Sequence, residues 1–197
     1  WFRIYHSLIY NFQRAFTGNL MLQKYYYMEE IFPLVDLNGN VIGKATRKEC
    51  HSGSFYLHPV VHLHVFNKDG ELYLQKRSND KDIQPGKWDT SVGGHVDFGE
   101  KLEDALLREA SEELGIVKCD PVFAFRYDFR SDKEYELVNT FITFYNGAII
   151  PDQKEISEGR FWEVSEILSS IGKSIFTPNF EYEIEKVLIF FDGLKRR

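Results

Sequence analysis

Three carboxylates fall within five residues of one predicted helix, at Glu109, Glu112 and Glu113. Positions i, i+3 and i+4 of an α-helix lie on one face, so these side chains share a stripe. Leu102 and Leu106 continue the same stripe toward the N-terminus, which is the pattern of a face that packs on a core. The acids therefore occupy positions that face inward, whereas an ordinary solvated acidic face would lie opposite them.

Carboxylates clustered at such positions need a counter-charge. Two of them about 4 Å apart repel by roughly 4 kcal/mol at an effective dielectric of about 20. Either their pKa values rise or a cation neutralises them. Hard divalent ions such as Mg²⁺ and Mn²⁺ prefer carboxylate oxygens, whereas zinc favours His or Cys ligands. We therefore interpret Glu109, Glu112 and Glu113 as a site for Mg²⁺ or Mn²⁺.

The segment from Gly94 to Ile116 has the spacing G-x5-E-x7-R-E-U-x-E-E-x-G-U, in which U is an aliphatic residue. This segment resembles the signature of the Nudix (MutT-like) hydrolases, and Ala110 is its one weak match. The resemblance extends over about residues 32–191 and implies a Nudix-type α/β/α sandwich with a mixed sheet and a loop–helix–loop motif. The alternative is a charged amphipathic helix that follows a glycine turn.

The resemblance also implies roles for individual residues. The metal ligands would be Glu109, Glu112, Glu113 and the backbone carbonyl of Gly93. Arg108 would orient these carboxylates through Glu100, although the two could instead form a surface ion pair. A metal in this position binds diphosphate oxygens and lowers the pKa of a bound water.

One glutamate would act as the general base in such a reaction. Glu112 and Glu113 are candidates within the signature, and both are therefore candidate catalytic residues together with Arg108 and Glu100. Nudix enzymes often take the base from a later loop, where the candidates are Glu134, Glu136, Glu155 and Glu158. The alternative for each is a solvated loop acid.

A second resemblance lies upstream, in the segments 75–81 and 85–89. They are similar to the Nudix branch that contains isopentenyl diphosphate isomerase and its hydrolase-like relatives. The resemblance implies that Arg77 and Lys81 hold the substrate diphosphate, for which local positive charge is required. An exposed basic turn is the alternative.

The match to the isomerase itself is partial. His58 and His95 fall where the isomerase has metal-binding histidines, and the pair Glu134 and Glu136 resembles its paired acids. The catalytic cysteine of the isomerase is missing, because Gly93 stands near its position. Moreover, the isomerase lacks two of the signature glutamates, whereas this chain keeps Glu109 and Glu112 at these two positions. These departures favour phosphoanhydride hydrolysis over isomerisation.

Composition limits the other classes of function. The 24 basic and 30 acidic residues give a net charge of -6, which does not favour a stable nucleic-acid partner. No stretch approaches the roughly 18 to 20 apolar residues that cross a bilayer. Cys50 and Cys119 match no metal spacing or disulfide framework, so we expect a reducing, cytoplasmic setting. We expect residues 1–27 to form an aromatic N-terminal extension, which either packs on the domain or a partner or does not belong to the domain, and the resemblance implies a Nudix domain over residues 28–197.

The expected elements are mostly strands. Hairpins are predicted at 32–45, around Asn38-Gly39-Asn40, and at 59–76, around the turn 67–70. Further strands are predicted at 89–92, 122–129, 136–145 and 159–164. Predicted helices are 101–114 closed by Gly115, 166–171 capped by Ser165, and a final helix that starts at Thr177-Pro178 and is closed by Gly193.

Four aromatic or imidazole side chains are open to a structural or a functional interpretation. His62 and His64 share one face of the strand 59–66, for which strand packing or surface placement is favoured over a pocket. Trp88 and Trp162 could stack on a base, but core packing is the expectation in so aromatic a chain.

The sequence thus predicts a Mg²⁺- or Mn²⁺-dependent Nudix hydrolase that cleaves the diphosphate linkage of a small molecule. A nucleoside diphosphate linked to another moiety is the substrate class that the resemblance implies, and a homodimer is compatible with the family. One alternative is a prenyl diphosphate isomerase. Another is a nucleotide-binding Nudix sensor without turnover.

Overall fold

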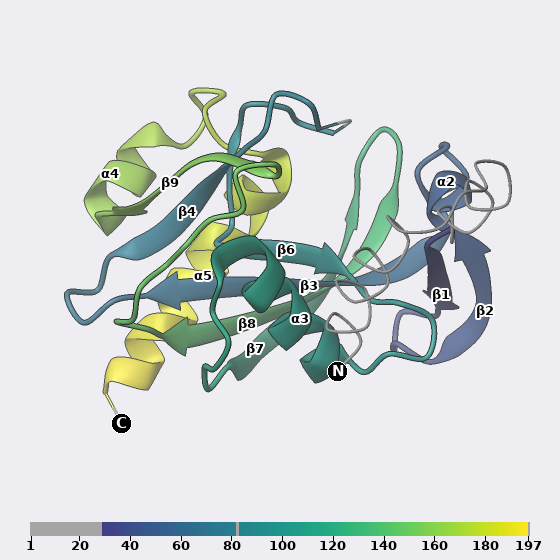
Figure 1. The fold of residues 1–197 in the computed structure, drawn as a ribbon, viewed down its shortest axis with the longest axis horizontal. Helices are drawn as coiled ribbons and strands as arrows, with labels where there is room; N and C mark the ends of the chain where they lie inside the picture. Colours follow the sequence, from purple (N-terminus) through teal and green to yellow (C-terminus); the bar gives the residue numbers. More distant parts are fainter. Residues whose placement is uncertain (1–28, 82, 197) are drawn as a thin grey trace, which may run out of the picture. The chain divides into compact units, whose positions relative to one another are not determined.

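The computed structural model describes residues 29–81 and 83–196 of the chain (Figure 1). One compact unit spans Ile31–Arg197. The aromatic extension expected at residues 1–27 lies outside the described residues. No helix in the described part of the chain combines the length and apolarity that a bilayer crossing requires.

The first described element is a two-stranded antiparallel sheet of β1 (Ile31–Val35) and β2 (Val41–Thr46). Its turn is held by the side chain of Asp36, whose Oδ1 accepts hydrogen bonds from the backbone N–H groups of Asn38 and Asn40, both at 2.9 Å. Gly39 has a φ of 84° within this turn, which favours glycine. The first predicted hairpin is therefore confirmed. A short helix, α2 (Arg47–Cys50), follows it directly.

The main sheet has seven strands and mixes parallel and antiparallel pairing. Its order is β5-β4-β3-β8-β7, with β6 also paired to β3 and β9 to β4. The strands are β3 (Leu57–Phe66), β4 (Leu72–Arg77), β5 (Trp88–Asp89), β6 (Val92–His95), β7 (Val122–Arg130), β8 (Tyr135–Phe144) and β9 (Ile156–Trp162). The predicted hairpin at 59–76 is only partly correct. A single pair, Phe66 with Leu72, joins β3 to β4, and β4 instead pairs along its length with β9.

Helices cover both faces of this sheet, as the predicted α/β/α sandwich requires. The alternation of β3 sends Val61 and Leu63 into a core with helix α3 (Leu102–Leu114). Phe66 packs on the opposite face against helix α5 (Pro178–Lys195). Figure 1 shows α3, in teal, and α5, in yellow, on opposite sides of β3 and β8.

The helix that carries the three acids ends where the sequence predicts. Gly115 closes α3 in the left-handed conformation, with a φ of 67°, and its N–H donates back to the last turn. This is the usual role of a glycine that follows a helix. Glu103 and Asp104 lie in the first turn, where negative charge is favourable to the helix dipole.

The two later helices depart from the prediction at their ends. Helix α4 (Val164–Ser170) has Glu163 as its N-cap, so the prediction that Ser165 caps it is wrong. Thr177 does cap α5, because its Oγ1 accepts from the N–H of Phe180 at 3.2 Å. The prediction that Gly193 closes this helix is wrong, since α5 runs on to Lys195. Phe191 stacks on Phe66, with ring centroids 3.6 Å apart, and keeps the last turns packed on the sheet.

Candidate active site

Arg108 is the centre of the hydrogen-bond network at the N-terminal side of the acidic stripe. Its Nε and Nη2 donate to the two carboxylate oxygens of Glu100, both at 2.9 Å. Nη2 also donates to the carbonyl of His95 at 3.0 Å. The expected contact between Arg108 and Glu100 is present, and it ties the loop after β6 to helix α3. Burial raises the pKa of Glu100, but the hydrogen bonds and charge of Arg108, together with the N–H of Asp97, outweigh burial and lower it.

The same guanidinium reaches two of the three acids on α3. Arg108 Nη1 donates to Glu109 Oε1 at 2.6 Å and lies 3.5 Å from Glu112 Oε2. Such charge-assisted bonds are short and directional. Arg108 therefore holds Glu109 and, more loosely, the partly exposed Glu112.

Glu113 points away from Arg108 and is buried. Its Oε2 accepts hydrogen bonds from the Gln75 side chain at 2.9 Å and from the backbone N–H of Gly93 at 3.2 Å. Burial and the charge of Glu109 raise the pKa of Glu113 to about 8, against these two hydrogen bonds. Burial also raises the pKa of Glu109 to about 7, although Arg108 acts in the opposite direction.

Burial first, and then the charges of neighbouring acids, disfavour negative charge at Glu109 and Glu113. An all-oxygen donor set with excess negative charge suits Mg²⁺ or Mn²⁺, so the residues fit the expected ion. The carboxylates of Glu109, Glu112 and Glu113 share one face of α3, as predicted. Among the described residues, however, their oxygens are not gathered within 4.8 Å of one another; Arg108 bridges Glu109 and Glu112, while Gln75 and Gly93 hold Glu113.

The two glycines before His95 differ in what surrounds them. A Cβ at Gly94 would overlap the carboxyl group of Glu109, so a side chain at this position would displace that carboxyl group. A Cβ at Gly93 would meet Thr90 Cγ2 at 3.5 Å and His62 Cδ2 at 3.6 Å, which are ordinary contacts. The assignment of the Gly93 carbonyl as a metal ligand stays a prediction, since the observed contact to Glu113 is made by its N–H.

Arg77 and Lys81, the predicted diphosphate-binding residues, each have an acidic partner. Arg77 Nη1 lies 3.2 Å from Asp89 Oδ2, and its Nε donates to the carbonyl of Ile83 at 3.0 Å. Lys81 Nζ lies 3.1 Å from Glu155 Oε2. Glu155 also contributes to the raised pKa values of Glu109 and Glu113. Lys81 and Glu155 therefore lie near the acids of α3.

A second cluster of possible ligands consists of His51, His58 and His95. One ring nitrogen from each lies within 4.8 Å of the others. His51 Nε2 and His95 Nε2 are 3.0 Å apart, and Glu134 Oε2 lies 3.4 Å from His51 Nε2. Sequence reasoning noted His58, His95 and Glu134 but missed His51, which follows α2 and reaches the others only through the tertiary fold.

The ring of His58 supports a metal-binding interpretation of this cluster. Its Nδ1 lies 2.9 Å from the carbonyl of Tyr56, so Nδ1 carries the proton and Nε2 is left with a lone pair. His58 Nε2 is buried without a hydrogen-bond partner in the described part of the chain. A buried, unpartnered nitrogen is costly unless it binds something. Imidazole together with carboxylate ligands fits a divalent transition metal such as Mn²⁺.

The remaining candidate side chains are buried within the fold. His62 and His64 lie on β3, as strand packing predicted, and both contact the buried carboxylate of Glu183 on α5. No pattern in the sequence indicated Glu183 as their partner. Burial lowers the pKa of His62, yet the charge and hydrogen bond of Glu183, together with the charges of Asp89 and Glu136, outweigh burial and raise the pKa to about 9. Trp88 and Trp162 are buried edge to face, with centroids 5.0 Å apart, which confirms the core prediction.

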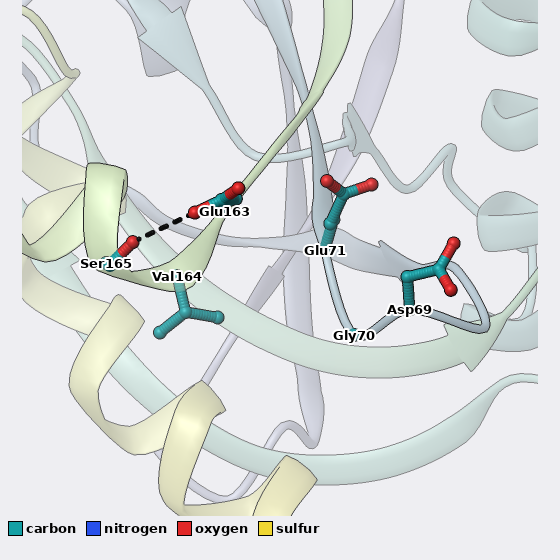
Figure 2. A pocket seen from close by; sticks show the side chains of 6 residues that line it. All are labelled: Asp69, Gly70, Glu71, Glu163, Val164 and Ser165. Atoms are coloured by element: carbon teal, nitrogen blue, oxygen red, sulfur yellow. Dashed lines mark hydrogen bonds between the residues drawn. The ribbon is translucent and has the colours of Figure 1, made fainter.

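A shallow cavity of about 460 Å³ lies elsewhere, between the β3–β4 turn and the start of α4. Figure 2 shows the side chains that line it, which include the carboxylates of Asp69, Glu71 and Glu163. Among the described residues, no lysine, arginine or histidine lines it. A diphosphate would be repelled by this lining, so we do not place the substrate there.

The family model and the curated relatives that match this chain agree with one another. The NUDIX domain model matches residues 56–180. An isopentenyl-diphosphate Delta-isomerase of Burkholderia multivorans is 32% identical over 166 residues, which cover 81% of this chain and 93% of that protein. A Nudix hydrolase of Streptomyces coelicolor, described as uncharacterized, is 29% identical over 154 residues, 77% of this chain and 84% of that protein.

The solved structures give the same result for the fold. The crystal structure of a Deinococcus radiodurans protein superposes with a TM-score of 0.65 at 26% sequence identity. The match covers 75% of this chain and 92% of that one. The sandwich of two helical layers around a mixed sheet is therefore shared with a solved protein.

Proposed function

The chain belongs to the Nudix family, and from this premise we propose that it hydrolyses the diphosphate linkage of a small molecule with the help of Mg²⁺ or Mn²⁺. The observation that carries the proposal is the arrangement around Arg108. This residue bonds Glu100 with two nitrogens and reaches Glu109 and Glu112, while the buried Glu113 lies against Gly93. A helix face with this much negative charge supports a cation site better than a structural role.

We assign the metal ligands as Glu109, Glu112, Glu113 and the carbonyl of Gly93. When bound, the ion supplies positive charge to the diphosphate and lowers the pKa of a water molecule. Arg108 and Glu100 orient the carboxylates. The absence of a side chain at Gly94 leaves room for Glu109 beside the strand.

Among the candidate general bases in later loops, Glu155 is favoured by position. Its charge acts on both Glu109 and Glu113, and Lys81 holds its carboxylate at 3.1 Å. Glu158 instead pairs with Lys76 at 3.7 Å. We propose that Glu155 takes a proton from the attacking water, with Glu112 and Glu113 as the alternatives within the helix.

Arg77 and Lys81 supply the positive charge that a diphosphate requires, and we assign both to its binding. The group beyond the diphosphate is proposed to be a nucleoside moiety, as in many members of the family. One solved neighbour is a Shewanella oneidensis Nudix domain complexed with ADP-ribose, which at 19% identity supports only the common fold.

The second candidate function is isomerisation of a prenyl diphosphate. The histidine cluster with Glu134 and the Burkholderia relative favour it. Gly93 argues against it, because no thiol is present at the position where the isomerase has its cysteine. Space does not explain the missing thiol, since a Cβ at Gly93 would make only ordinary contacts. A sensor without turnover is a third reading, and the complete set of signature glutamates argues against it.

A substrate panel separates these functions. Sugar nucleotides, dinucleotides, oxidised nucleotides and isopentenyl diphosphate are incubated with the protein and Mg²⁺ or Mn²⁺, and products are identified by mass spectrometry. We expect phosphate-containing hydrolysis products from at least one nucleoside diphosphate derivative. Binding without turnover across the panel would support the sensor, and conversion of isopentenyl diphosphate without hydrolysis would support the isomerase.

A further inference from the structure

A buried polar cluster lies on the face of the sheet that packs against α5. Glu183 is fully buried, and its Oε1 accepts hydrogen bonds from His62 Nδ1 at 2.7 Å and from His64 Nε2 at 3.1 Å. Thr140 Oγ1 donates to Glu183 Oε2 at 3.0 Å. A carboxylate buried in this way needs a compensating positive charge. Among the described residues, His62 and His64 are the basic groups that contact it.

The two histidines face different surroundings. His64 has no exposed surface, and Thr90 Oγ1 lies 3.3 Å from its Nε2. His62 is 7% exposed and lies opposite Gly93 in the pairing of β3 with β6. Its Nε2 is 3.8 Å from the position that a Cβ would take at Gly93. Within the described ranges, the only hydrogen bond of the His62 side chain is the one to Glu183.

The charged groups around His62 link it to the proposed diphosphate site. Glu183, Asp89 and Glu136 act on its imidazole. Asp89 is paired with Arg77, and the Arg77 guanidinium also acts on Glu136. His62 on β3 and Arg77 on β4 therefore act on the same two acids, Asp89 and Glu136.

We propose that His62 is a further substrate-binding residue, whose Nε2–H donates a hydrogen bond beside Gly93 to an oxygen of the diphosphate that Arg77 holds. Glu183 is its positioning residue, because it fixes the ring through Nδ1 and compensates its charge. This inference rests on the proposed function, since it needs a diphosphate at Arg77.

Calorimetric titration of the full chain with inorganic pyrophosphate, in the presence of Mg²⁺, tests the role of His62. His64→Gln is the matched control, because it removes a hydrogen bond to the same oxygen of Glu183 without altering the ring beside Gly93. We expect the variants His62→Gln and His64→Gln both to lower the Tm, because each loses a contact to the buried Glu183. Only His62→Gln should weaken pyrophosphate binding, by about tenfold or more, as expected for the loss of a hydrogen bond between charged groups.

A second measurement does not depend on how well a variant folds. In the wild-type chain, pyrophosphate should shift the ¹⁵N resonance of His62 Nε2 and leave that of His64 Nε2 in place. Glu183→Gln should weaken pyrophosphate binding in the same direction as His62→Gln. Equal pyrophosphate affinities in the two histidine variants, or an unmoved His62 resonance, would overturn the inference.

The outcomes also separate this inference from the proposed function. If the wild type hydrolyses a diphosphate but His62→Gln and His64→Gln bind pyrophosphate with equal affinity, His62 does not bind substrate and the proposed hydrolase function still stands. If pyrophosphate binding depends on His62 but no compound of the panel is hydrolysed, the proposed hydrolase function is wrong and the role of His62 in binding still stands.

Discussion

Glu113 is buried, has a raised pKa and accepts a hydrogen bond from the N–H of Gly93. Glu112, one position earlier, is exposed, and its contact with Arg108 is long, at 3.5 Å. The two acids therefore differ in how firmly the fold holds them. Under the proposed function both are metal ligands, and Glu113 is the one whose orientation is already fixed. Removing its charge should leave its hydrogen-bonded neighbours Gln75 and Gly93 in place.

Substituting either acid with glutamine tests the metal site. Glu112→Gln and Glu113→Gln should each lower turnover by at least about 100-fold, because each removes a metal ligand or the base. Glu103→Gln, in the first turn of the same helix, is the matched control and should keep turnover. Circular dichroism checks that the helix is intact. Full activity in both variants would remove the metal-site assignment.

Gly94 offers a steric test of the same site. Gly94→Ala should disturb the site because its Cβ would overlap Glu109, whereas Gly43→Ala on β2 is the control, because its Cβ would make only ordinary contacts with Leu34. We expect turnover to fall at least about tenfold in Gly94→Ala relative to Gly43→Ala, the effect of a misplaced ligand. Steady-state kinetics under saturating Mg²⁺ give the comparison. Equal turnover would show that Glu109 need not lie against the strand.

The spacing of the signature was enough to predict that its acids share one face of α3, because positions i, i+3 and i+4 lie together on a helix, and their role as metal ligands stays a prediction. The spacing could not give the partners that come from distant segments. Gln75 reaches Glu113 from β4, and Glu183 reaches His62 from α5. His51 joins His95 across 44 positions of sequence. Contacts of this kind depend on the sheet order, which local patterns do not encode.

At the scale of elements, helix ends were the least predictable feature. Gly115 and Gly193 both follow apolar helical segments, yet only Gly115 adopts a positive φ. α5 continues through Gly193 because Phe191 still packs on β3. Strand positions were predicted well from alternation and turn residues, except at 89–92. There the chain forms two short strands, β5 and β6, which pair with β4 and β3 respectively. The pairing of β4 with β9 was missed, because a short turn at 67–70 suggested a simple hairpin.

The two glycines give a prediction for stability. Gly193→Ala should stabilise the protein by about 0.5 to 1 kcal/mol, since alanine is favoured inside a helix and its Cβ would meet nothing. Gly115→Ala should destabilise it, because alanine is strained at a φ of 67°. Urea unfolding measures both changes. A loss of stability in Gly193→Ala would instead support the sequence-based prediction that Gly193 closes the helix.

The loop between β4 and β5 gives a prediction for substrate binding. Lys81→Gln should raise KM for the diphosphate substrate by about tenfold, because it removes a cation whose charge-assisted contacts are each worth about 1.5 to 3 kcal/mol. Lys76→Gln is the control, since Lys76 pairs with the exposed Glu158 instead. Initial-rate kinetics give KM for both variants. An unchanged KM in Lys81→Gln would show that Lys81 does not bind the diphosphate and serves only as the ion-pair partner of Glu155.

For the whole molecule, the acids of α3 make stability depend on pH and metal together. The pKa values of Glu109 and Glu113 are raised to about 7 and about 8, above the ordinary value of 4.5. Their folded forms bind protons more tightly than their unfolded forms. In chelator, their contribution to the free energy of unfolding is therefore greatest at low pH and falls as the pH rises from 4.5 to about 8.

Mg²⁺ should reverse this trend, because it binds the ionised carboxylates of the folded protein. We expect Mg²⁺ to raise the free energy of unfolding more at pH 8 than at pH 5. The comparison is made by urea unfolding with Mg²⁺ and with EDTA at each pH. Glu113→Gln should reduce the difference, and an equal effect of Mg²⁺ at both pH values in the wild type would contradict a carboxylate metal site.

In the proposed reaction, water attacks phosphorus at a diphosphate of the substrate. The most direct measurement is turnover of the diphosphate panel in ¹⁸O-labelled water with Mg²⁺ or Mn²⁺, followed by mass spectrometry of the products. We expect ¹⁸O in a phosphate group of the product from at least one nucleoside diphosphate derivative. Unlabelled diphosphate products, with isopentenyl diphosphate isomerised and no phosphoanhydride cleaved, would contradict it.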